Sequence, residues 1–159
     1  MIRWMSIFFL VFINCKQVYD VYNREIDYLK NIVYLRTEGL IALQQLKKFP
    51  DHIDVKLIEH IIDNLYVNTQ NQLVELCTDK ELYLHESDYD QILSQVEIRE
   101  MAKDSEKYHL LLSLLNENLL NQKELYIHLL KEPGLKEMKS FAYESYLRLI
   151  ALEVEFDAI

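Results

Sequence analysis

Glycine, proline and cysteine are scarce in this chain, each occurring only twice among 159 residues. Hairpins and tight loops depend on Gly, Pro, Asn and Asp, and an antiparallel sheet needs many such turns. Leucine, glutamate, lysine and glutamine, which favour helices, are frequent instead. The composition therefore predicts an all-α fold. Because the connections between the expected helices are short, we expect an antiparallel bundle of four to five helices.

The same scarcity bears on chemistry. A nucleophile elbow or a phosphate-binding loop needs clustered glycines, whereas Gly39 and Gly134 stand far apart. Two cysteines, Cys15 and Cys77, exclude a disulfide framework, although a single bond between them is one alternative. Cys77 lies in an apolar helical context, which indicates a buried, inert thiol. We expect a protein without enzymatic activity or a cofactor.

Basic side chains are outnumbered, 17 against 26 acidic ones, so the chain carries a net charge of −9. Such a field repels the phosphates of nucleic acids and the headgroups of anionic lipids. We therefore expect no nucleic-acid partner. The length suits one domain with a sizeable core.

The spacing of apolar residues predicts four helical segments. The first helix spans about 18–48 and ends at Phe49-Pro50. The second begins near Asp51, and we expect it to be kinked or weakly buried at 68–72. The third begins at Ser87 and breaks near Asp104, and the last follows Pro133-Gly134. The apolar stripe of the first helix is interrupted by one charge, Arg36. Gly39 in the same helix indicates close helix packing or a mild bend.

The first 15 residues have the layout of an export signal. Arg3 precedes an apolar run from Ile7 to Ile13, and Cys15 closes it. A helix needs about 20 apolar residues to cross a bilayer, so this run is too short to span one. A basic residue followed by a short apolar run is typical of a secretory signal.

With Cys15 at its end, this stretch resembles the processing site of bacterial lipoproteins. The resemblance covers Met1–Cys15 only, and Phe12 and Asn14 stand where the usual motif has leucine and a small residue. It implies that residues 1–14 are a cleaved signal peptide and that Cys15 is lipidated with acyl chains such as palmitate. Residues 15–159 would form the anchored domain. Because Lys16 is not the aspartate that retains enteric lipoproteins at the inner membrane, the resemblance implies an outer-membrane location.

Histidines and carboxylates form no strong metal motif. Glu106 and His109 have the spacing of one half of a di-iron site, but no second such pair exists. The other candidate metal ligands are more simply explained as solvated residues on helix faces or as helix caps. They are the pairs Glu124/His128 and Glu81/His85, the acidic residues Asp79, Glu81, Glu86, Asp88 and Asp90, and the scattered His52, His60 and His85. We expect no metal site.

Tyrosine is the remaining peculiarity, with 11 residues. Tyr19, Tyr22, Tyr28 and Tyr34 fall early in the first expected helix, and Tyr143 and Tyr146 fall in the last. Tyrosine suits protein interfaces, but it also suits the edge of a helical core.

Three functional hypotheses follow. The first is an exported, lipid-anchored helical protein that binds an unknown protein partner, as an envelope assembly chaperone or pilotin, an immunity-type inhibitor or a surface antigen. The second is a soluble intracellular helical regulator whose apolar N-terminus packs into the core. The third, a metal or redox bundle enzyme, depends only on Glu106 and His109.

Overall fold

The structure is a computed structural model of the whole chain. It describes the backbone of residues 2–51, 55–83, 85–99 and 104–156, and the side chains of residues 20–51, 56–83, 85–96 and 106–154. All regular structure in this part is helical. The helices are α1 (Ile2–Leu46), α2 (Val55–Ile61), the π-helix η1 (Ile62–Val67), α3 (Asn68–Asp79), α4 (Glu86–Arg99), α5 (Asp104–Lys131) and α6 (Lys136–Phe156).

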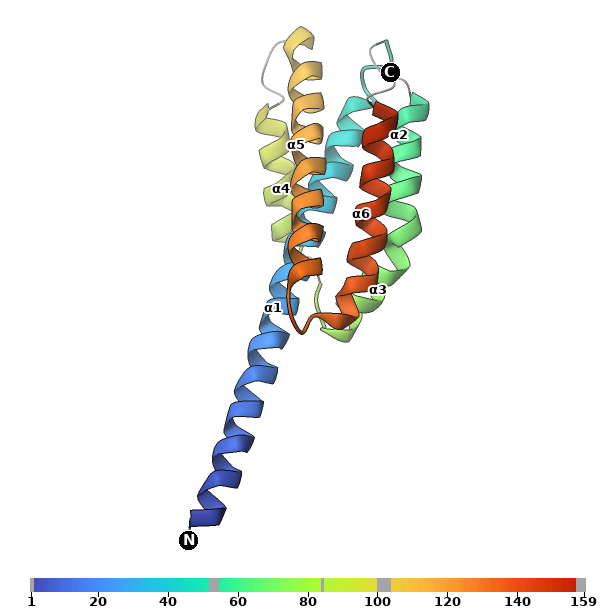
Figure 1. Cartoon of the computed structure of the whole chain (residues 1–159). Coiled ribbons are helices and arrows are strands. Elements are labelled where there is room, and N and C mark those ends of the chain that lie inside the picture. The colour runs from blue at the N-terminus through green and yellow to red at the C-terminus, as the bar shows by residue number, and fades with distance from the viewer. Residues whose placement is uncertain (1, 52–54, 84, 100–103, 157–159) are drawn as a thin grey trace.

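The helices alternate in direction and form an antiparallel bundle (Figure 1). Helices α2, η1 and α3 follow one another without interruption, so the described chain forms five rods. The turn between α5 and α6 is short and contains Gly134, whose φ of +93° suits glycine. This architecture confirms the all-α bundle predicted from composition.

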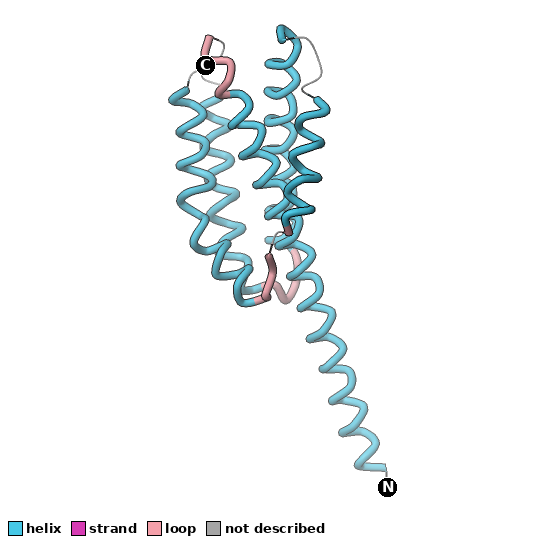
Figure 2. The backbone as a smooth tube through the Cα atoms, turned by 180° about the vertical axis from the view of Figure 1, so that it is seen from behind, coloured by secondary structure: helices cyan, strands magenta, loops and turns pink. Residues whose placement is uncertain are grey.

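The first rod differs most from the expectation. Helix α1 begins at Ile2 rather than near Val18, because residues 2–17 contain no glycine or proline to end it. Its N-terminal part projects beyond the other helices (Figures 1 and 2). The side chains of residues 1–19 are outside those described, Cys15 and Tyr19 among them.

The second rod is distorted, as expected, but one turn before the predicted position. The π-helix η1 precedes the polar interval at 68–72, and the Asn68 amide donates to the carbonyl of Asp63, five residues earlier. The carbonyl of Leu65, within η1, accepts a bond from Thr69 Oγ1 at 2.6 Å. Side-chain donors that enter a helical carbonyl ladder are a known cause of such distortion.

A charged residue lies in the middle of this bundle. Arg36, which interrupts the apolar stripe of α1, is only 3% exposed. Its Nη1 donates to Thr69 Oγ1 at 2.8 Å and its Nη2 to the carbonyl of Tyr66, also at 2.8 Å. The guanidinium lies 5.0 Å from the centre of the Tyr66 ring and 5.8 Å from that of Phe141. One side chain of α1 therefore contacts η1, α3 and α6.

Helix α5 joins the same polar cluster through two amides. Gln122 Nε2 donates to Tyr66 Oη at 3.0 Å and to Asn118 Oδ1 at 2.7 Å. Asn118 Nδ2 in turn donates to the carbonyl of Leu35 and to Glu38 Oε2. Burial of Tyr66 raises the pKa of its phenol, which keeps the hydroxyl protonated. We call Arg36, Tyr66, Thr69, Asn118 and Gln122 the central polar cluster.

Gly39 makes room for this cluster. A Cβ at position 39 would overlap the Tyr66 hydroxyl and would lie 2.8 Å from Asn118 Oδ1. The expected reason for Gly39, close helix packing, is thereby confirmed. The residues that approach it belong to η1 and α5.

At the opposite end of α3, an ion pair fixes the rod to α1. Lys80 Nζ lies 2.7 Å from Glu25 Oε2, and both side chains are largely buried. The same ammonium lies 5.2 Å from the centre of the Tyr22 ring. The hydrogen bond to Glu25 raises the pKa of Lys80, which outweighs the lowering effect of burial.

We expect Arg36→Ala to lower the free energy of unfolding by about 3 kcal/mol, because it opens a cavity and leaves buried acceptors unpaired. Arg24→Ala is the matched control, since Arg24 pairs with Glu132 on the surface and its side chain is 43% exposed. An exposed pair of this kind contributes less than about 1 kcal/mol. Urea unfolding followed by circular dichroism measures both, and equal losses would contradict a structural role for Arg36.

Gly39→Ala tests the close approach of the three helices. Alanine favours a helix over glycine by about 1 kcal/mol, but overpacking of a filled interior costs about 1–3 kcal/mol. We expect a net loss of about 1 kcal/mol, from the overlap with Tyr66 and Asn118. The exposed Gln44→Ala in the same helix should not lose stability. A more stable Gly39→Ala would show that the space is larger than described.

Candidate binding groove

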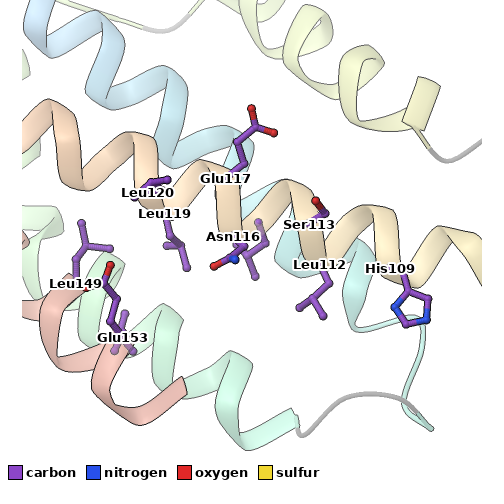
Figure 3. Close-up of a pocket in the computed structure, with 11 residues that line it drawn as sticks. His109, Leu112, Ser113, Asn116, Glu117, Leu119, Leu120, Leu149 and Glu153 are labelled. Carbon is purple, nitrogen blue, oxygen red and sulfur yellow. The ribbon is translucent and has the colours of Figure 1, made fainter. Parts of the chain in front are cut away.

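Helices α5 and α6 form an open groove at the end of the bundle remote from the turn that joins them. They meet at residues 132–135 and separate toward the N-terminus of α5 and the C-terminus of α6 (Figure 1). The groove has a volume of about 940 Å³. Its lining residues, most of them labelled in Figure 3, are His109, Leu112, Ser113, Leu115, Asn116, Glu117, Leu119 and Leu120 of α5 and Leu149, Leu152 and Glu153 of α6.

The lining is mainly leucine. Leu115, Leu149 and Leu152 are buried and belong to the core, whereas Leu120 is 50% exposed. Leu112 and Leu119 are partly buried and lie against the core from the α5 side. Water therefore reaches an apolar surface that continues into the core.

Carboxylates supply the charge of the groove. Glu153 Oε1 and Oε2 each lie 2.7 Å from Lys123 Nζ, and both residues remain partly exposed. Glu117 is exposed and has no ion pair with any described residue. No lysine or arginine is found among the eleven described lining residues, and Lys123 neutralises Glu153, so Glu117 supplies the unpaired negative charge of the groove.

A smaller hollow of about 500 Å³ lies on the other side of α6, lined by His60, Asn64, Glu144, Leu147, Arg148, Ala151 and Leu152. Its charges already neutralise each other, because Arg148 Nη2 lies 2.7 Å from Glu144 Oε1. Gln72 Nε2 also donates to Glu144 at 3.1 Å. The bond from Arg148 lowers the pKa of Glu144. This set connects α3 to α6.

The histidine and carboxylate candidates do not converge. Within the described side chains, no group of three or more His, Cys, Asp or Glu is placed to hold a metal ion. His109 is exposed on the edge of the groove, with its ring 5.2 Å from that of Tyr108. His52 lies outside the described residues.

Cys77 is a free, half-buried thiol, and burial raises its pKa. A protonated thiol is a poor nucleophile. This agrees with the expected structural role, although Cys77 is less buried than predicted. Cys15, the expected lipidation site, is part of α1 but its side chain is not described.

The tyrosines divide between core and surface. Tyr66 and Tyr126 are fully packed, and Tyr34 donates to Gln95 at 2.6 Å, within the bundle. Tyr143, at 55% exposed, and Tyr22, at 41%, remain accessible. The described tyrosines thus include both buried and exposed side chains.

The groove was missed from the sequence, although α5 carries a signal for it. A core-facing helix needs an apolar stripe of about 100°. Between residues 110 and 120, α5 has leucine at 110, 111, 112, 114, 115, 119 and 120, which covers more than one face. The excess leucine indicates a second apolar surface besides the core.

Comparison with family models, with curated proteins and with solved structures finds no match to this chain. Within the described helices there is no stretch long and apolar enough to cross a membrane.

Proposed function

We propose that this protein is held at a bacterial outer membrane by a lipid on Cys15 and acts without catalysis, by binding another protein through the α5–α6 groove. The groove carries the proposal, because it exposes an apolar surface continuous with the core. Surfaces of this kind mark binding sites more often than they remain bare. A role as assembly chaperone or pilotin, immunity-type inhibitor or surface antigen is compatible with it.

The anchor is supported by the N-terminal sequence. Arg3, the apolar run and Cys15 resemble a lipoprotein signal, and cleavage there would make the net charge one unit more negative than −9. An acidic surface is repelled by anionic headgroups, so attachment needs the lipid. Each buried methylene of an acyl chain contributes about 0.8 kcal/mol, and several chains anchor stably.

Helix α1 also suits a tether. The N-terminal part of α1 projects beyond the other helices (Figure 2), and Cys15 belongs to this helix; after cleavage before Cys15, the α1 residues from 15 onward would link the lipid to the bundle. A lipid on Cys15 would therefore lie at one end of the molecule. The α5–α6 groove lies at the opposite end of the bundle (Figure 1).

Cys15→Ser tests the anchor in the native host. We expect the wild type in the membrane fraction with the mass of a lipidated chain that begins at Cys15. The variant should accumulate as an unprocessed precursor or as soluble protein with unchanged helical content. Cys77→Ser is the matched control and should stay membrane-bound. Soluble wild type that begins at Met1 would favour the intracellular regulator instead.

Photo-crosslinking tests the groove independently of the anchor. A benzoylphenylalanine at the exposed position 113, on the edge of the groove, should give a covalent adduct with another protein in the host. The adduct should fall about tenfold when Leu120→Gln removes an exposed apolar contact. The same label at the exposed position 78, in the last turn of α3, is the control. Equal adducts at both positions would contradict a binding role for the groove.

A further inference from the structure

From the chemistry of the groove, we infer that its partner is an amphipathic helix of another protein, with lysine or arginine beside its apolar face. This inference rests on the protein-binding function proposed above and specifies the class of partner. Three features of the groove support it: the kind of backbone that lines it, its length and its charge.

The lining determines what kind of backbone can bind. All eleven lining residues belong to α5 or α6, and along the groove the N–H and C=O groups of these helices bond within the helix, apart from the last carbonyls of α6, from Glu153 onward. The groove therefore has no strand edge that could hydrogen-bond an extended peptide. A segment that leaves water must have its own N–H and C=O groups paired, and a helix meets this requirement by itself.

The length of the groove determines the size of the helix. From His109 to Leu120 the lining covers eleven steps of α5, or about 16 Å at 1.5 Å per residue. This corresponds to about three helical turns. A partner helix with apolar residues at i, i+3 or i+4, and i+7 would place them along this distance.

The charge of the groove determines which residues we expect beside the apolar face of the partner helix. Glu117 has no ion pair within the described structure, and Glu153 shares only Lys123. Because the described lining contains no lysine or arginine and Glu153 is already paired, a lysine or arginine beside the apolar face of the partner would gain its attraction at Glu117, on the outer side of α5. A second copy of this chain is a poor occupant, since two molecules of charge −9 repel each other.

A library of random 16-residue peptides, displayed on phage and selected on the purified full-length protein, tests this inference without choosing a sequence beforehand. We expect enriched peptides with apolar residues at helical spacing and with lysine or arginine beside them. A synthetic copy should gain helical circular dichroism on binding and should bind more weakly as salt rises.

Matched variants connect that binding to the groove. Leu120→Gln should weaken the synthetic peptide about tenfold or more, whereas Val74→Gln, at a residue of α3 that is equally 50% exposed, should leave it unchanged. Glu117→Lys should weaken it further than Glu75→Lys, an exposed site on α3 with the same change in net charge. Circular dichroism of each variant confirms that the fold is retained.

The outcomes separate the two proposals. Enriched peptides that depend on Leu120 but are acidic, or lack helical spacing, would overturn the inferred partner class and leave the binding function of the groove in place. Selection that yields no peptide sensitive to Leu120→Gln would overturn both. A dimer in light scattering that dissociates in Leu120→Gln would show that a second copy occupies the groove, which also overturns the inference.

Discussion

The bundle is organised around one buried cation that has no carboxylate partner. Arg36 makes no ion pair within the described structure and is held by hydroxyl and carbonyl oxygens and by two aromatic faces. Burial of an uncompensated charge is costly, so these contacts must all be present together. Because they come from η1, α3 and α6, the guanidinium fixes how three other elements sit against α1. A bundle held by leucines alone would allow its helices to slide and rotate more freely.

Two irregular features accompany this centre. The π-helical η1 places the Leu65 carbonyl where Thr69 binds it and the Tyr66 carbonyl where Arg36 binds it. Gly39 lets the Tyr66 hydroxyl approach the α1 backbone, where Gln122 of α5 donates to it. Neither feature suits an isolated helix, since glycine and a π-turn both weaken one. They exist because the assembled polar cluster stabilises them.

The proposed functional parts lie at opposite ends of this rigid centre. Near the turn between α5 and α6 the two helices pack closely, with the Tyr126 and Phe141 rings 5.8 Å apart. Beyond the cluster they separate, and Leu112, Leu119 and Leu120 line the groove that results. The lipid proposed on Cys15 would lie in the N-terminal part of α1, at the end of the molecule opposite the groove. Such a molecule would present its groove away from the membrane, toward partners of the same compartment.

The amino-acid sequence determined the all-α fold, the end of the first helix before Pro50 and the helix boundaries around residues 86, 104 and 136, because turn residues and apolar spacing act locally. It also marked Arg36 as the charge that interrupts the apolar stripe of the first helix, and Gly39 as a glycine inside that helix. The only indication of lipidation, at Cys15, comes from the sequence as well. It did not reveal that Arg36 is buried beside Tyr66, since those two residues approach only when α1 packs on η1. The groove likewise depends on how far α5 and α6 separate, and Leu115 and Leu120 look alike in a leucine-rich helix. Tertiary packing decided which leucine is covered and which faces water.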